Sequence, residues 1–191
     1  MLLVAEGFQI DTYYDQETLL NGAFLAPFNA IIFGLHQKTW SSTGRADLDA
    51  WIRLGGGMFI YSDSASGGLH SLVGLQNTVG QGVVNALISP YGLEVCVDQS
   101  NGIQAYRAGP AATHPVVAGR PVLEGEGVSP VAIDIATGAT VLIPFSDHPD
   151  NYIRGVTEVP HQQNLTITNA VFAALAMTQV GDGKIVVMFD R

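Results

Sequence analysis

The chain has 191 residues, of which 47% are hydrophobic and 13% charged, so it can bury one core of ordinary size and we expect a single domain. Its formal net charge of -9 repels phosphate backbones and anionic lipid, so neither nucleic acid nor a membrane is expected as a partner. The one cysteine, Cys96, excludes an internal disulfide and fits a reducing, cytoplasmic location. No apolar run reaches the roughly 18 residues of a membrane span, and the first residues carry charge too early for a signal peptide.

The first half of the chain alternates predicted strands and helices. Gly7 is expected to end a short helical turn, and Phe8 to Tyr14 alternates like a strand. Asn29 to Leu35 is a continuous apolar run, which predicts a strand buried on both faces. Thr43 to Leu54 carries a helical apolar stripe that a glycine ends, and Met58 to Ser62 is the next buried strand.

The second half of the chain has a different pattern, with short strand candidates between predicted helices. Leu69 to Ser89 predicts one or two helices, whereas Ala170 to Val180 predicts a further helix and Lys184 to Asp190 a final buried strand. Between them lie short strand candidates separated by turn residues: Leu93 to Val97, Ile103 to Tyr106, Val131 to Ile135 and Thr140 to Pro144.

This order of elements predicts an α/β fold. Apolar strands that alternate with helices indicate a mostly parallel sheet with helices on both faces, because parallel strands need crossover connections. The short strands predict an antiparallel β insertion at the edge of the sheet, over about residues 93–168. In such a sheet a ligand site lies beyond the carboxyl ends of the strands.

Polar and titratable residues follow the predicted strand ends. A loop is polar anywhere, and a short Asp or Ser there commonly caps a helix, so each residue alone has a structural interpretation. As a group they indicate a site: Tyr14 and Asp15; His36, Gln37 and Lys38; Ser62, Asp63 and Ser64; Asp190 and Arg191.

Five phrases occur in order along most of the chain: NAIIFGL, AWIRLGGG, MFIYSD, THPVVAG and VGDGKIVVMFD. Their order resembles the class I glutamine amidotransferase-like superfamily, in particular its non-amidotransferase branches of the trehalose-utilisation type and related flavodoxin-like domains of larger bacterial proteins. True amidotransferases of this superfamily place their catalytic cysteine on the turn after the GGG strand, but here that turn reads SDSASGG. The resemblance therefore implies a flavodoxin-like domain without amidotransferase chemistry, which binds a small, sugar-like or acyl ligand or a partner at the carboxyl edge.

A hydrolase of esters, lactones, amides or glycosides is the alternative function. Ser64 or Asp63 would serve on the strand-to-helix turn, although the sequence D-S-A-S-G has a glycine on only one side of the turn. The base would be His36, which follows a strand end, or His148, which forms an H-x-D pair with Asp150. A structural or assembly role through an exposed edge is the third hypothesis.

The residues predicted to bind the ligand are ones that lie at or near the ends of the predicted strands. Trp40 could stack on a sugar or a partner, or could simply cap the end of the core. Histidine and carboxylate residues of the kinds that bind metal occur here, but none sits at a diagnostic spacing, so no metal or cofactor is predicted. The ligand-binding set is Asp63, Ser62, Gln37, Trp40 and Asp190.

The first residues bear on the oligomeric state. Members of the superfamily open with a buried strand and a helix before the strand expected at Phe8, whereas this chain opens inside that helix. The resemblance thus implies that the first strand is missing and that a second copy covers the gap, so we expect a homodimer. Alternatively, the segment MLLVAE is itself the first strand, in a hairpin with the next one.

Overall fold

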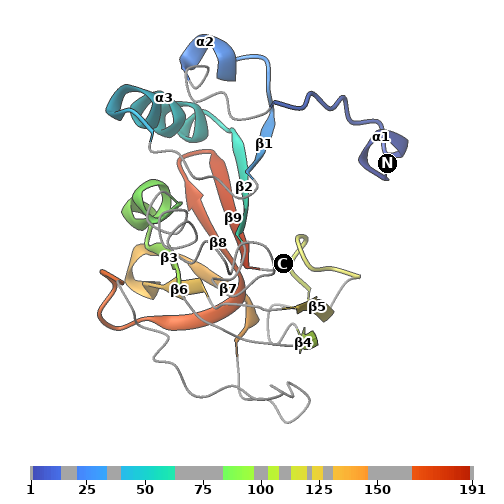
Figure 1. The fold of residues 1–191 in the computed structure, drawn as a ribbon, viewed down its shortest axis with the longest axis vertical. Helices are drawn as coiled ribbons and strands as arrows, with labels where there is room; N and C mark the ends of the chain where they lie inside the picture. The colour runs from blue at the N-terminus through green and yellow to red at the C-terminus, as the bar shows by residue number, and fades with distance from the viewer. Residues whose placement is uncertain are drawn as a thin grey trace, which may run out of the picture.

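The computed structural model describes residues 2–13, 21–33, 40–62, 84–96, 103–107, 113–119, 122–126, 131–145 and 165–189. Figure 1 shows the elements, which are in chain order α1 (Leu2–Ala5), α2 (Gly22–Leu25), β1 (Ala30–Phe33), α3 (Ser42–Arg53), β2 (Gly57–Ser62), a helical segment over 84–88, the 3-10 turn η3 (Ser89–Tyr91), β3 (Leu93–Val95), β4 (Ile103–Arg107), β5 (Val122–Glu126), β6 (Val131–Ile133), the 3-10 turn η4 (Ile135–Thr137), β7 (Thr140–Pro144), β8 (Val171–Val180) and β9 (Gly183–Phe189).

One mixed sheet organises the molecule. Its strand order is β1-β2-β9-β8-β6-β3, and β7 also pairs with β8. The pairs β1/β2 and β2/β9 are parallel, whereas β8 pairs antiparallel with β9, β6 and β7, and β6 pairs antiparallel with β3. Strands β4 and β5 form a separate antiparallel ribbon. The predicted α/β class and the antiparallel strands beside the parallel ones are confirmed.

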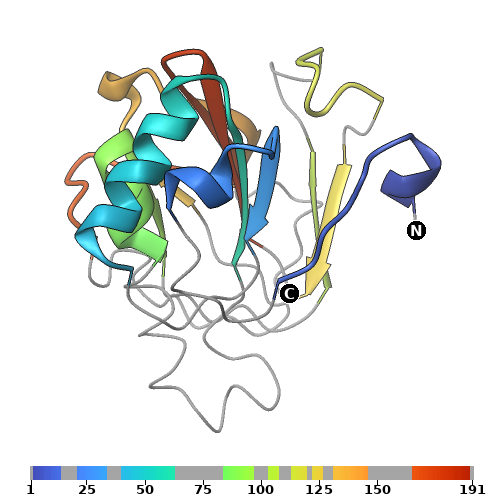
Figure 2. The ribbon, with the colours of Figure 1, turned by 90° about the horizontal axis from the view of Figure 1, so that it is seen from above.

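Helix α3 shows how the sequence fixes an element on this sheet. Its N-cap is Ser41, whose hydroxyl oxygen accepts a hydrogen bond from the Gly44 N–H at 3.0 Å. Leu48 and Ile52 are buried on its apolar face, and Gly55 takes φ 111° just after the helix. Helices α2, α3 and the 84–88 segment lie together on one side of the sheet (Figure 2). The prediction of a helix from Thr43 to Leu54 is confirmed.

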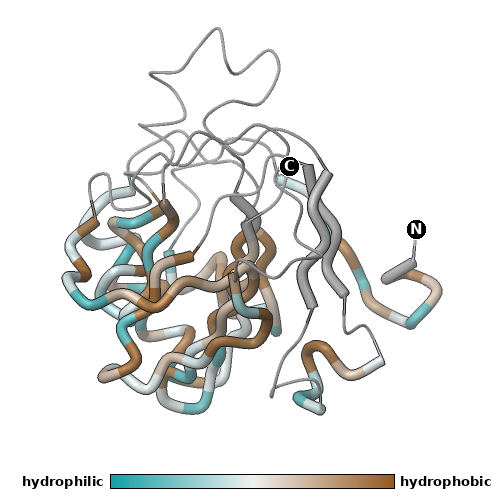
Figure 3. The backbone as a smooth tube through the Cα atoms, turned by 90° about the horizontal axis from the view of Figure 1, so that it is seen from below, coloured by the Kyte–Doolittle hydropathy of each residue, from teal (hydrophilic) through white to brown (hydrophobic). Residues whose placement is uncertain are grey.

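The hydrophobic core lies between these helices and the central strands. Figure 3 shows hydrophobic stretches running along the strands of the sheet. Its largest fully buried side chains come from α2, α3, the 84–88 segment and the sheet strands: Leu25, Ile52, Met58, Ile60, Ile88, Leu93, Ile133, Leu142, Ile143 and Ile185. Within the described ranges, no helix has the length and apolarity needed to cross a membrane.

Residues Ala170 to Val180 correct one prediction, because Val171–Val180 is the strand β8 and not a helix. The run is rich in Ala, Leu and Met, which favour helices in isolation. In the fold it is hydrogen-bonded to strands along both of its edges, and residues 173–176 are all buried. Tertiary pairing therefore overrides the intrinsic preference, as it does for short apolar runs whose periodicity is ambiguous.

The segment predicted as a strand from Phe8 to Tyr14 is a second correction. Residues 8–13 belong to no strand, and Phe8 and Tyr13 are 61% and 50% exposed. The alternative that MLLVAE forms a first strand is also wrong, because Leu2–Ala5 is helical and Gly7, with φ 89°, donates its N–H to the Val4 carbonyl. The helical turn ended by Gly7 is confirmed.

The strand predicted from Asn29 to Leu35 is confirmed over Ala30–Phe33, but it is not buried on both faces. Ala30 and Ile32 are exposed, whereas Ile31 and Phe33, which point to the opposite face, are half-buried; β1 is also the last strand on its side of the described sheet. The described strands leave no gap between β2 and β9, which pair directly from Gly57 opposite Lys184 onward. Among the described strands, none pairs with the outer side of β1.

Candidate functional site

The carboxyl ends of three strands meet at one edge of the sheet. Strands β1, β2 and β9 run parallel, with Phe33 opposite Ile60 and Ser62 opposite Phe189. Because the register is continuous, the chain leaves all three strands on the same side of the molecule (Figure 1). This edge, defined by Phe33, Ser62 and Phe189, is called the carboxyl edge below. The predicted common edge is confirmed for these three strands.

The structure places two of the predicted site residues. Ser62 is the last residue of β2 and so lies at the carboxyl edge. Trp40 is 4% exposed, and its ring contacts that of Phe33, the last residue of β1, at a centroid distance of 4.9 Å and an interplanar angle of 71°. Trp40 thus packs in the core at the end of β1, as the capping interpretation has it, and its contact with a ligand stays a prediction. The others lie outside the described residues: His36, Gln37, Asp63, Ser64, His148, Asp150 and Asp190.

The cysteine of the chain follows a strand that is remote from β2 in the sheet. Cys96 directly follows β3 and is 2% exposed. Strands β9, β8 and β6 stand between β2 and β3 in the sheet. The thiol therefore occupies a buried strand-end position, and the turn after β2 has no cysteine in its sequence. The sequence directly after β2 therefore supplies no thiolate that could attack glutamine.

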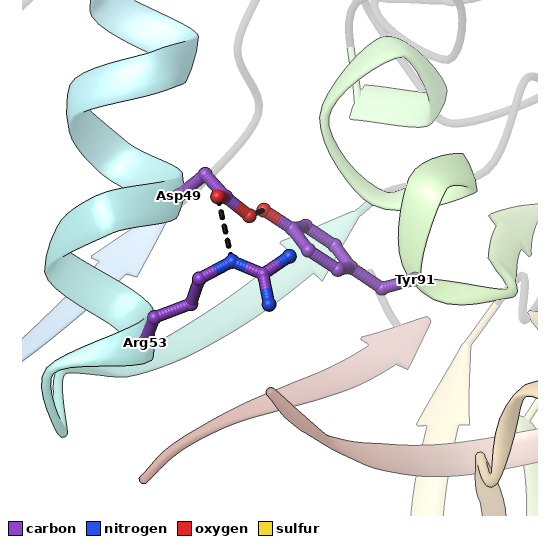
Figure 4. Close-up of polar contacts among 3 residues, drawn as sticks. All are labelled: Asp49, Arg53 and Tyr91. Atoms are coloured by element: carbon purple, nitrogen blue, oxygen red, sulfur yellow. Dashed lines mark hydrogen bonds and ion pairs between the residues drawn. The ribbon is translucent and has the colours of Figure 1, made fainter. Parts of the chain in front are cut away.

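Sequence reasoning missed a polar cluster that joins helix α3 to η3 (Figure 4). The Arg53 Nε donates to Asp49 Oδ2 at 2.7 Å, and the Tyr91 hydroxyl donates to Asp49 Oδ1 at 2.6 Å. The hydrogen bond from Arg53 is the main cause that lowers the pKa of Asp49, while burial and then the Asp49 bond raise the pKa of Tyr91. The i, i+4 spacing of Asp49 and Arg53 was readable on a helix, but nothing local signals Tyr91.

A second missed feature is the buried carboxylate of Glu94 on β3, which is 1% exposed. Its Oε2 accepts the backbone N–H of Thr166 at 2.8 Å and that of Ile167 at 3.3 Å, and its Oε1 accepts the Thr166 hydroxyl. Burial of a charge is costly unless such donors surround it. The carboxylate thus holds the segment that leads into β8. No sequence pattern predicts this role.

The outer edge of β3 is occupied by a side chain. Asn85 Nδ2 donates to the Val95 carbonyl at 3.0 Å, and Asn85 Oδ1 accepts the Val95 N–H at 2.8 Å. The amide thereby makes the two hydrogen bonds that a neighbouring strand would make. In the described part of the chain, no group of three His, Cys, Asp or Glu residues is placed to hold a metal ion.

Comparison with known proteins gives a fold and no sequence family. No family model matches the chain, and no curated protein matches it. Among solved structures, a protein described as ThuA-like from Bacteroides uniformis has a TM-score of 0.58 at 15% identity, and the match covers 98% of this chain and 69% of that one. The chain shares the fold of this ThuA-like protein.

Two further solved structures are similar to the chain over almost all of its length. The mmIFT52 N-terminal domain has a TM-score of 0.62 at 12% identity over 99% of this chain and 76% of that chain. Cytoplasmic protein STM3548 from Salmonella typhimurium has a TM-score of 0.57 at 17% identity over 98% and 72%. Identities this low establish the fold alone. The chain thus shares its fold with a ThuA-like protein, and the sequence that directly follows β2 has no cysteine.

Proposed function

We propose that the chain is a binding domain of ThuA-like fold, without thiolate amidotransferase chemistry, that takes a small sugar-like or acyl ligand at the carboxyl edge. The observation that carries the proposal is the continuous parallel register of β1, β2 and β9, which brings three strand ends to one edge. In open α/β sheets ligands bind beyond such ends. The sequence that follows these ends is polar and lacks the nucleophile of the true amidotransferases.

The residue types that follow the strands favour a neutral, hydroxyl-rich ligand. Gln37, Asp63 and Asp190 supply amide and carboxylate oxygens, which accept hydrogen bonds from hydroxyl groups. The net charge of -9 disfavours phosphorylated or otherwise anionic ligands. The packed rings of Phe33 and Trp40 give the edge a firm apolar support on the β1 side.

The same reasoning extends to the surroundings of the domain. Two structural neighbours from Salmonella typhimurium are described as cytoplasmic proteins, which supports a cytoplasmic location for this chain. Nucleic acid and membrane surfaces are not among the proposed partners, because the chain carries an excess of acidic residues. A second copy of the chain is the proposed macromolecular partner.

Thermal-shift and calorimetric titrations against a panel of neutral sugars and acyl compounds test the proposal. Asp63→Asn and Gln37→Ala should weaken binding of the best ligand at least tenfold. Asp182→Asn is the matched control, because Asp182 lies in the turn before β9, at the opposite end of the strand from the carboxyl edge. If no member of the panel binds, or if all three variants bind equally well, the proposal is wrong.

Turnover assays on the same purified chain test the hydrolase alternative. We expect no turnover of chromogenic esters, amides or glycosides above the solvent rate. Turnover that Ser64→Ala abolishes while the melting curve is unchanged would replace the binding proposal by hydrolysis at the strand-to-helix turn.

A further inference from the structure

The two outer edges of the sheet are protected to different degrees. Strand β3 is three residues long, and the Asn85 amide hydrogen-bonds both the N–H and the carbonyl of Val95 at its outer edge. Strand β1 reads Ala-Ile-Ile-Phe, without charge or proline, and no described strand pairs with its outer side. Ile32 in its middle is 61% exposed. Soluble proteins normally blunt such an edge with charge, proline or a covering element, so β1 is the edge fitted to receive another strand.

An N-terminal arm, residues 2–13, leaves the body close to this edge (Figures 1 and 2). Its root is held by aromatic contacts, because the Tyr13 ring lies 4.9 Å from that of Phe24 and 6.1 Å from that of Phe28, two residues before β1. Beyond this root, residues 8–12 make no hydrogen bond with any other described residue. Phe8 and Val4 remain 61% and 56% exposed. Figure 3 shows hydrophobic residues along the arm outside the core.

The arm has the pattern of a strand without a partner strand. Phe8 and Ile10 alternate with Gln9 and Asp11, which is the period of a strand with one apolar face. Within one copy that face is partly open, since Phe8 is 61% and Ile10 37% exposed. Among the described residues, the chain therefore carries an extended segment with apolar residues that belongs to no sheet, and a sheet edge on which no strand pairs.

We propose that two copies of the chain dimerise by reciprocal exchange of their N-terminal arms, with the arm of each copy pairing on the outer edge of β1 in the other. A two-fold dimer uses both arms and both edges and leaves neither exposed. This inference goes beyond the proposed ligand binding and does not depend on it. The ligand would bind at the carboxyl edge, whereas the arm pairs along the side of β1.

The area of such an exchange reaches what a specific dimer needs. Val4, Phe8, Ile10 and Ile32 are exposed in each copy, and at roughly 100 Å² each their complete burial in the dimer would remove at most about 800 Å². The backbone of the two added strands brings the total to about 1,200 Å², where specific interfaces begin. A one-way contact would bury only half of this, so the area favours reciprocal exchange.

Light scattering after size exclusion gives the first test, on the complete chain at micromolar concentration. We expect the mass of two chains for the wild type and of one chain for Ile32→Lys, because a lysine in the middle of an edge strand opposes pairing. Ile135→Lys is the matched control: Ile135 is also 61% exposed, but lies in η4 away from β1. It should remain a dimer, and circular dichroism melts should show that both variants are folded.

Cross-linking identifies the partners of the contact. Differently tagged Ile10→Cys and Ile32→Cys chains are mixed and treated with a short bis-maleimide, while the wild type, whose Cys96 is buried, is the blank. We expect a mixed-tag product, and at least tenfold less of it when Ile135→Cys replaces Ile32→Cys. A monomeric wild type, a dimer that Ile32→Lys leaves intact, equal loss of the dimer in both lysine variants, or no mixed-tag product would each overturn the proposal.

Discussion

Replacement of Glu94 separates the need for a hydrogen-bond acceptor from the need for a charge. The carboxylate is 1% exposed and accepts two backbone N–H groups on Oε2 and one hydroxyl on Oε1. In Glu94→Gln, the amide oxygen can still accept from both backbone groups, and the amide N–H₂ can donate to the hydroxyl oxygen of Thr166. We therefore expect a loss of at most about 1 kcal/mol in the free energy of unfolding, since only the charge assistance is removed.

Glu94→Leu has a similar volume but no acceptor. It removes three hydrogen bonds, from the Thr166 N–H and hydroxyl and from the Ile167 N–H, at about 1 kcal/mol each, because Thr166 is exposed and Ile167 half-buried and water can reach them. The apolar side chain offsets part of this, so the expected net loss is about 2 kcal/mol, a large share of the roughly 5–15 kcal/mol that stabilises a domain. Thr166→Val, which removes only the hydroxyl, should cost about 1 kcal/mol.

Urea unfolding followed by circular dichroism measures all three variants, with the slope m checked for constancy. The expected order of stability is wild type, then Glu94→Gln together with Thr166→Val, then Glu94→Leu. Equal losses for the Gln and Leu variants would show that the charge matters and the acceptor geometry does not. A Leu variant as stable as the wild type would contradict the hydrogen bonds themselves.

Four further predictions concern the Asp49 cluster, two glycines and the net charge of the chain. Arg53→Gln should raise the pKa of Asp49 towards its ordinary value, which NMR titration would follow. Because the pKa of Asp49 is lowered in the folded state, its contribution to stability is present above the unfolded-state pKa and is lost as the pH falls through the folded-state pKa. Gly92→Ala should destabilise the fold by at least about 2 kcal/mol, because φ is 75° and the new Cβ would meet the Thr137 side chain. Gly138→Ala should cost only about 1 kcal/mol in the same unfolding assay, since φ is 86° but the space around it is open. The proposed dimer should dissociate less at high salt, measured by light scattering, because each copy carries a net charge of -9 and salt screens the repulsion.

Local patterns predicted the parallel part of the fold well. The apolar stripe of α3 and the apolar runs of β1, β2 and β9 lie where the sequence placed them, because each pattern matches the period of its element. Their common carboxyl edge follows from the parallel register, which the alternation of strands and helices implies.

The error at β8 shows where local patterns fail and which signal could have corrected them. An Ala-rich apolar run fits both a helix and a buried strand, so its own residues do not decide. The turn after it does, because Gly181 and Asp182 lie between two apolar runs, and G-D in that setting is a hairpin signal. Val180 pairs with Gly183 in the structure, so β8 and β9 form that hairpin.

Long-range polar contacts were beyond sequence reasoning altogether. Glu94 meets residues 72 and 73 positions later in the chain, and Tyr91 meets Asp49 42 positions earlier. No local pattern records such distances. The candidate catalytic residues Ser64, His36, His148 and Asp150 lie outside the described residues, so their mutual geometry remains a prediction.

The two tryptophans allow the most direct test of ligand binding at the carboxyl edge. Trp40 packs on Phe33 at the carboxyl end of β1, whereas Trp51 donates its indole N–H to the Phe28 carbonyl at 3.2 Å and lies against Gly56, just before β2 begins. Fluorine NMR of the chain labelled with 5-fluorotryptophan reports on both ends of the strands at once. During titration with the ligand found in the panel, the Trp40 signal should move and the Trp51 signal should stay. Movement of the Trp51 signal alone, or of neither signal at saturation, would contradict binding at the carboxyl edge.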